Sequence, residues 1–162
     1  MAKFPSYDII LAIDDPSNAG ILAFFESRPG AVADVHVSRA PDSVPQPYLT
    51  LGTHPDLVER LWDRLTSLLP EPCQWVVYGH PALVHPGTGV IFGFAQGTHA
   101  YALRLPSPER DEAIAAGAKT QFAYPNATLD LRPAGDEWLF GSWHINEPRW
   151  CLAAYEAAGR LR

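Results

Sequence analysis

Basic residues are scarce in this chain, and no run of them occurs. Twelve lysines and arginines stand against eighteen aspartates and glutamates, which gives a formal net charge of −6 at pH 7. Proteins that bind nucleic acid neutralise its phosphates with a positive surface, so the charge excludes nucleic acid as the expected partner. A partner protein, in particular a basic one, is what the charge favours.

Cysteine is scarce too, and long hydrophobic runs are absent. The two cysteines are Cys73 and Cys151. No apolar run reaches the roughly 20 residues of a membrane-spanning helix. The first residues, MAKFPSYDIILAIDD, lack the uncharged core and cleavage site of a signal peptide. We therefore expect a cytoplasmic protein without a membrane partner, in which both cysteines are reduced and buried.

The composition that remains is that of a globular protein. Hydrophobic residues make up 47% and charged residues 19% of the 162 residues, which argues against disorder. The length predicts one globular domain over residues 1–162. Ten of the twelve basic residues are arginine, and alanine and proline are plentiful, as is typical of GC-rich bacterial genomes.

Residues 74–105 dominate the predicted fold. Glycine-containing turns at Pro86–Gly89 and Gln96–Gly97 separate β-rich runs, since glycine adopts positive φ in tight hairpins. The segment is predicted to be a three-stranded antiparallel meander, with residues 74–78 also extended. A four-residue loop and a two-residue turn would place His85 opposite Val90.

The same turns pair Leu83 with Phe92, Pro81 with Phe94, and Phe94 with His99. Because side chains alternate across a strand, the pairing sorts the meander into two faces. The bulky predicted face carries Leu83, His85, Val90, Phe92, Phe94, His99, Tyr101 and Leu103. The small predicted face carries Ala82, Val84, Ile91, Gly93, Ala95, Ala100, Ala102 and Arg104.

The remaining elements predict an α+β fold in which about four helices pack on an antiparallel sheet. The predicted helices cover residues 16–27, 54–69, 107–116 and 147–159. Asp14 and Asp15 could suggest acid/base chemistry or a metal, but a helix cap before Pro16 is the simpler interpretation. Thr53 with Asp56 resembles a capping box. The second helix is predicted to bury one stripe: Leu57, Val58, Leu61, Trp62, Leu65, Leu68 and Leu69.

The N-terminal half also matches the element order of a split βαβ, or ferredoxin-like, unit. Strands are expected at 7–13, 33–39, 48–52 and 74–78, with the first two helices between them. Such an arrangement predicts no particular function.

Three histidines in or beside the meander raise the question of a metal. His80, His85 and His99 could bind one and leave a position open for water. However, no HExxH or HxH spacing occurs, and His80 falls on the other side of its strand from His85 unless a bulge intervenes. Structural histidines are the interpretation that we prefer, and no cofactor is expected.

No motif for a nucleophile or a phosphate loop occurs, so the chain is predicted to be non-catalytic, although absent motifs do not exclude an enzyme. Aromatic side chains near the meander could line a ligand pocket, bind a partner, or simply fill the core. The candidate partner- or ligand-binding residues are His85, Phe92, His99, Tyr101, Trp143 and His144.

Residues 78–117 resemble the TfoX N-terminal and YjbR-type small domains. The similar features are Tyr78-Gly79 at a strand end, the apolar strand 90–94, the strand 101–105 ending in a basic residue, and the acidic helix 109–117. The resemblance covers about a third of the chain and contains no invariant chemical residue. It implies a binding or regulatory role and assigns no residue a function.

Two hypotheses follow. The first is a non-catalytic acidic domain that binds another protein, for instance an immunity, antitoxin-type or regulatory protein of a bacterium. The alternative is a small-molecule- or metal-binding enzyme with His85, His99 and Tyr101 in a pocket lined by Phe92, Phe94 and Trp143. Exposed sheet edges would also allow a homodimer.

Overall fold

The computed structural model describes residue 12 and residues 15–27, 37–39, 53–78, 80–96, 100–124, 127–142 and 147–161. Within these residues the fold is α+β, as predicted. The helices are α1 (Pro16–Glu26), α2 (Pro55–Glu59), α3 (Glu109–Ala115) and α4 (Pro148–Gly159). A π-helical turn, η3 (Arg60–Arg64), and a 3-10 turn, η4 (Leu65–Leu68), continue α2. None of the described helices is long and apolar enough to cross a bilayer.

The described strands form one six-stranded antiparallel sheet and a separate hairpin. The sheet order is β1 (Val37–Arg39), β2 (Gln74–Val77), β3 (His80–Val84), β4 (Ile91–Gln96), β5 (Ala100–Arg104) and β8 (Trp138–Ser142). The hairpin pairs β6 (Gln121–Tyr124) with β7 (Ala127–Asp130), and a 3-10 turn, η5 (Arg132–Ala134), follows it. The meander over 74–105 is confirmed, but it contains four strands because β2 turns directly into β3.

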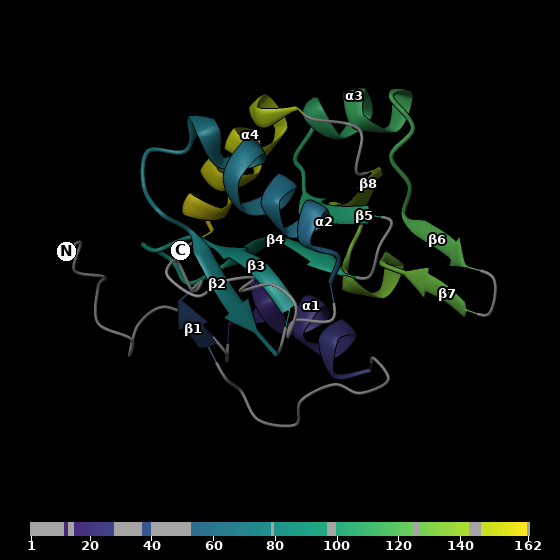
Figure 1. The fold of residues 1–162 in the computed structure, drawn as a ribbon, viewed down its shortest axis with the longest axis horizontal. Helices are drawn as coiled ribbons and strands as arrows, with labels where there is room; N and C mark the ends of the chain where they lie inside the picture. The colour runs from purple at the N-terminus through teal and green to yellow at the C-terminus, as the bar shows by residue number, and fades with distance from the viewer. Residues whose placement is uncertain are drawn as a thin grey trace.

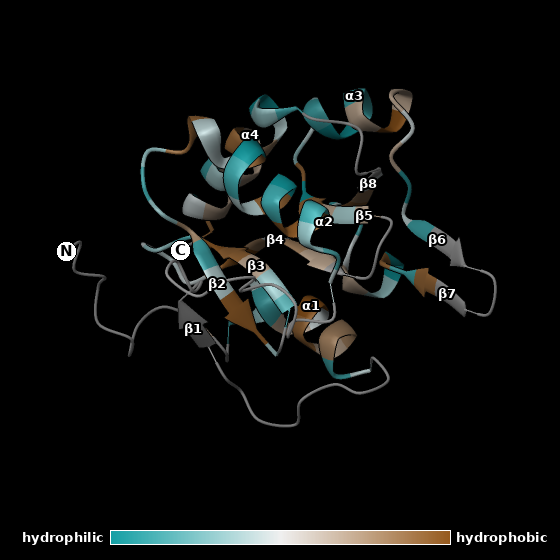
Figure 2. Ribbon diagram, in the orientation of Figure 1, coloured by the Kyte–Doolittle hydropathy of each residue, from teal (hydrophilic) through white to brown (hydrophobic). Residues whose placement is uncertain are grey.

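Helices cover both faces of the sheet. Figure 1 shows α2 and α4 on one face and α1 on the other. The two faces have separate cores, one around Trp62, Leu83, Phe92 and Tyr101 and the other around Phe25, Trp75, Phe94 and Phe140. In Figure 2 hydrophobic colours are frequent along the central strands, whereas the first part of α3 and the outward side of α2 are hydrophilic. Burial on both faces explains why the strands read as nearly continuous apolar runs.

The first predicted turn is correct. His85 donates its backbone N–H to the carbonyl of Val90 at 2.9 Å, and Gly89 donates to the carbonyl of His85 at 2.8 Å. Val84 then lies opposite Ile91.

A β-bulge changes the register beyond this point. Leu83 lies opposite Gly93, so Phe92 is the additional residue on β4. A Cβ on Gly93 would be 3.1 Å from both Leu83 Cδ1 and Leu103 Cδ2, so Gly93 faces the same core as Phe92. The bulge turns Phe94 toward α1, so Phe94 lies on the opposite face of the sheet from the one predicted.

The second turn is longer than predicted. Gln96 lies opposite Ala100 and Ala95 opposite Tyr101, so the connection spans residues 97–99, which lie outside the described residues. The predicted pairing of Phe94 with His99 is therefore wrong, and Ala95 joins the core of Tyr101. The bulge and the longer connection each exchange the two predicted faces for the residues that follow. Tyr101 comes after both, so the two exchanges cancel and Tyr101 keeps its predicted face.

The split βαβ order is not formed. β2 lies between β1 and β3, and Val37 is opposite Val77. The ferredoxin-like order would require residues 7–13 beside β2, where no edge remains free. Of the strands predicted at 7–13 and 48–52, the structure describes only residue 12, whose backbone N–H donates to the carbonyl of Gly89 at 3.0 Å.

The helix starts are partly as predicted. Asp15 caps α1, because its Oδ1 accepts the N–H of Ser17 at 2.8 Å. The expected capping box at Thr53 is wrong: the cap of α2 is His54, whose Nδ1 accepts the N–H of Asp56 at 3.1 Å. Pro55 at the first helical position makes its predecessor the cap.

The helix after Pro55 also changes type. The carbonyl of Trp62 accepts hydrogen bonds from Thr66 Oγ1 at 2.6 Å and Gln74 Nε2 at 2.8 Å. The predicted buried stripe continues through η3 to Leu65, which is fully buried. Leu68, in the 3-10 turn that follows, was predicted to be buried but is 53% exposed.

Candidate functional site

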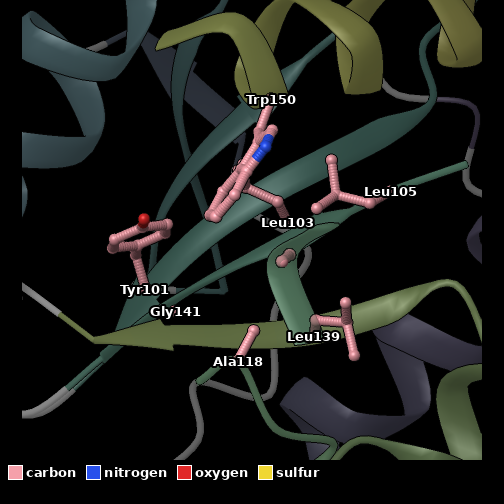
Figure 3. Close-up of a pocket in the computed structure, with 8 residues that line it drawn as sticks. Tyr101, Leu103, Leu105, Ala118, Leu139, Gly141 and Trp150 are labelled. Carbon is pink, nitrogen blue, oxygen red and sulfur yellow. The ribbon is translucent and has the colours of Figure 1, made fainter. Parts of the chain in front are cut away.

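The candidate site is a hollow between the sheet and the helices α3 and α4. Its free volume is about 10 Å³, which is roughly the space of one water molecule. In Figure 3 the indole of Trp150 extends from α4 toward the sheet, between Tyr101 on one side and Leu103 and Leu105 on the other. The lining is almost entirely carbon and consists of Tyr101, Leu103, Leu105, Ala113, Ala118, Leu139, Gly141 and Trp150.

Trp150 contributes a hydrogen-bond donor without a partner. The residue is only 5% exposed, and its Nε1 is buried and makes no hydrogen bond within the part of the chain that the structure describes. A buried donor left unsatisfied costs about 1 to 3 kcal/mol, so such groups are uncommon in folded proteins. The nitrogen has almost no accessible surface, so it is an unsatisfied donor within the packed core beside the hollow.

Tyr101 forms one wall, and its position depends on a glycine. A Cβ added at Gly141 would lie 2.7 Å from Tyr101 Cζ, so only glycine permits the ring to lie against β8. Burial raises the pKa of the Tyr101 hydroxyl well above its usual range, although the cation of Arg60 opposes the change. Tyr101 is therefore a neutral phenol at physiological pH and not a base.

An acidic surface lies beside the hollow. We define it as the four carboxylates Glu109, Asp111, Glu112 and Glu147, which belong to α3 and the residue before α4. Arg149 Nη1 lies 2.6 Å from Glu112, and Arg149 Nε lies 3.8 Å from Glu147. The hydrogen bond to Glu112 raises the pKa of Arg149.

The net charge of the acidic surface is negative, and the surface carries an exposed apolar residue. Two guanidinium groups, Arg110 and Arg149, stand against the four carboxylates, and Arg110 Nε donates to the backbone oxygen of Asp136 at 2.7 Å. Ile114, three residues after Asp111 on α3, is 43% exposed. An exposed isoleucine among carboxylates combines the two features that a basic partner with an apolar patch would recognise.

The structure separates the histidines that were considered as metal ligands. His80 is buried and stacks on Phe25 of α1, with ring centroids 4.6 Å apart, whereas His85 stacks on Tyr155 of α4, also at 4.6 Å. These helices cover opposite faces of the sheet. Among the described residues there is no group of three or more His, Cys, Asp or Glu placed to hold a metal. His99 lies outside them.

His85 has a structural environment. Its Nδ1 accepts the N–H groups of Gly87 at 3.0 Å and Thr88 at 3.3 Å, which closes the turn from β3 to β4. Tyr155, on which it stacks, donates its hydroxyl to Glu71 Oε1 at 2.9 Å. Burial lowers the pKa of His85, and the carboxylate of Glu71 opposes this shift.

The two cysteines are free and buried, as the sequence predicted. Burial raises the pKa of the Cys73 thiol far above its usual range and that of Cys151 to about 12. A nucleophilic cysteine needs a lowered pKa and access to solvent. Neither thiol therefore has the environment of a catalytic nucleophile.

The pocket expected from the sequence is not assembled as predicted. Phe92 and Phe94 belong to the cores on opposite faces of the sheet, so no single pocket on the meander contains both. Tyr101 does line the hollow, and Trp143 and His144 lie outside the described residues. Trp150 lies in the last predicted helix, over residues 147–159, but nothing in the sequence pattern distinguished its unpaired N–H. The small residues Ala113, Ala118 and Gly141 were the available signal, since small side chains on converging elements leave space.

Comparisons with family models, with curated proteins and with solved structures find no match to this chain.

Proposed function

We propose that this chain is a non-catalytic binding domain whose acidic surface binds a basic partner protein. The observation that carries the proposal is the exposed Ile114 on a helix with carboxylates at Glu109, Asp111 and Glu112. Carboxylates at a rim steer a basic partner and select its orientation, while an apolar side chain at the centre supplies affinity.

The chemistry of the described residues supports a binding role. The buried thiols of Cys73 and Cys151 and the phenol of Tyr101 have raised pKa values, and the histidines His80 and His85 lie on opposite faces. An immunity or antitoxin-type protein is the specific version in which the basic partner is a toxin. The resemblance of residues 78–117 to TfoX N-terminal and YjbR-type domains stays a prediction that agrees with a binding or regulatory role.

A charge-reversal pair tests the proposal. The native protein, Asp111→Lys and Glu156→Lys are immobilised separately and exposed to lysate of the source cells. Glu156 is an exposed acid on α4, outside the acidic surface, so both variants change the net charge equally. We expect a stoichiometric partner that the native protein and Glu156→Lys retain, that salt releases, and that Asp111→Lys loses by about tenfold.

Two outcomes would contradict the proposal. One is the absence of any stoichiometric partner for the native protein. The other is an equal loss of binding for Asp111→Lys and Glu156→Lys, which would indicate an effect of net charge alone. Ile114→Ser provides an independent check, because it removes the apolar side chain without changing the charge.

A further inference from the structure

The last turn of α4 rests on the turn that joins β3 to β4. Thr88 Oγ1 donates to the carbonyl of Ala158 at 3.1 Å, and this carbonyl is one of the last four of the helix, which have no N–H partner four residues further on. The ring of His85 stacks on Tyr155. A Cβ added at Gly159 would lie 2.7 Å from His85 Nε2, so glycine is what allows the helix to come this close. His85 and Thr88 therefore hold the end of α4 against the sheet.

The neutral imidazole of His85 fixes the shape of this turn. Its Nδ1 accepts the N–H groups of Gly87 and Thr88. The hydroxyl of Thr88 accepts the N–H of Val90 at 3.3 Å while it donates to α4, so the position of Thr88 depends on an unprotonated Nδ1. A protonated imidazole has two donors and no acceptor. An imidazolium would therefore place its own N–H against the two N–H groups of the turn.

The charged groups around His85 do not replace the lost acceptor. Burial lowers the pKa of His85, and the carboxylate of Glu71, which precedes β2, opposes this shift. From α4, Tyr155 brings a phenol that donates to Glu71, and burial raises the pKa of this phenol to about 12. Glu156 and Arg160 of α4 are exposed. Glu71 and the carbonyl end of α4 both attract a cation, but neither accepts the N–H groups of the turn, so the charged ring has to leave them.

We propose that residues 85–89 form a pH-sensitive latch on the end of α4, which is closed while His85 is neutral and is opened by a proton on its Nδ1. In the open latch Thr88 no longer caps the helix at Ala158, and the last turn of α4 separates from residues 85–89. Ala158 belongs to the core on this face of the sheet, and Tyr155 packs against that core, so opening exposes part of it. The latch goes beyond the proposed function, because it lies away from the acidic surface and needs no partner protein.

Nuclear magnetic resonance of the native full chain tests the latch directly. The imidazole resonances of His85 are followed between pH 7.5 and 5.0, a range that spans the ordinary pKa of histidine. We expect the nuclear Overhauser effects between Thr88 and Ala158 to disappear as His85 takes up its proton. The helix-typical ¹³Cα shifts of residues 157–159 should decrease by about half or more, because a helix end without tertiary packing frays. Those of residues 153–154 should stay unchanged.

Two variants assign the pH response to His85. The amide oxygen of His85→Asn can accept the same N–H groups without titrating, so the contact between Thr88 and Ala158 should persist throughout the pH range. His54→Asn is the matched control, because His54 Nδ1 also accepts a backbone N–H, at the start of α2, and this variant should open as the native protein does.

Three results would overturn the proposal. The first is a contact between Thr88 and Ala158 that persists in the native protein after His85 is protonated. The second is an imidazole of His85 that stays neutral down to pH 5.0, since the latch would then not respond to mild acid. The third is loss of the contact in His85→Asn at the same pH as in the native protein, which would place the titrating group elsewhere.

Discussion

The ring of Tyr101 lies against the α-carbon of Gly141, so closely that a Cβ there would be 2.7 Å from Tyr101 Cζ and 2.9 Å from its hydroxyl oxygen. The two residues are directly opposite each other on β5 and β8. Tyr101 is 1% exposed and cannot move aside without disturbing the core. We therefore predict that Gly141→Ala destabilises the fold by about 1 to 3 kcal/mol, as overpacking does. Urea denaturation measures the change.

A second substitution tests whether the clash with Tyr101, and not simply any substitution on strand β8, causes this loss of stability. Tyr101→Leu removes the aromatic ring that the new methyl group meets. The double variant Gly141→Ala/Tyr101→Leu should then lose less stability than the sum of the two single variants. Additive losses would mean that the contact between residues 101 and 141 does not account for the effect.

The second prediction concerns Asn18. It is fully buried, donates to the carbonyls of Ala12 at 2.8 Å and Gly89 at 2.9 Å, and accepts the N–H of Ile91 at 2.9 Å. Asn18→Asp has the same shape but turns a carboxylate oxygen toward two carbonyl oxygens. We predict a loss of about 3 to 5 kcal/mol at neutral pH, which is the usual cost of an uncompensated buried charge.

The pH dependence of the Asn18→Asp variant gives a further check. Burial and the two carbonyl oxygens should raise the pKa of the new carboxyl in the folded state above its unfolded value of about 3.9. A raised folded pKa means that stability is lost as the pH rises through that value. The gap between the native protein and the variant should therefore narrow as the pH falls toward 4. A gap that stays constant would show that charge is not the cause.

Local signals explain which parts of the fold could be predicted. The turn at residues 86–89 depends on nearby glycines, and its pairing of His85 with Val90 is correct. The bulge at Phe92 depends instead on Leu83 and Leu103, which fill the space that Gly93 leaves. Those contacts join different strands, and no local pattern encodes them. The pairing of β1 with β2 joins segments more than thirty residues apart and was missed for the same reason.

The candidate site was less predictable than the fold. Tyr101 was expected on the bulky face and lines the hollow from there. Trp150 lies in the last predicted helix, which the structure forms as α4. Its missing hydrogen bond depends on what α3, β5 and β8 place around it, and that is a property of the assembled fold. Side-chain periodicity reports burial, but it does not report whether a buried donor finds an acceptor.

The buried thiols provide a simple kinetic prediction. Cys73 and Cys151 are both 0% exposed, and burial raises the pKa of each. A disulfide reagent such as Ellman's reagent should therefore react with neither thiol in the native protein except through opening of the fold. Two thiols should react at once in concentrated urea. Rapid reaction of one thiol under native conditions would contradict the burial of that residue.

His85 predicts how stability responds to mild acid. Its Nδ1 accepts two backbone N–H groups, from Gly87 and Thr88, so protonation there would break both hydrogen bonds. Burial lowers its pKa below the ordinary value, and the unfolded chain therefore binds the proton more readily. Stability should be fully present above the unfolded pKa of about 6.5 and should decrease as the pH falls toward the folded pKa.

Asparagine at this position isolates the contribution of His85. Its side-chain oxygen can accept the same N–H groups in an Asx turn, but it does not titrate. We expect the stability of the native protein to fall relative to His85→Asn between pH 7.5 and 5.5, measured by urea denaturation at each pH. The other histidines are present in both proteins, so their titration cancels in the difference. Parallel stability curves for the two proteins would mean that Nδ1 is not the acceptor that closes the turn.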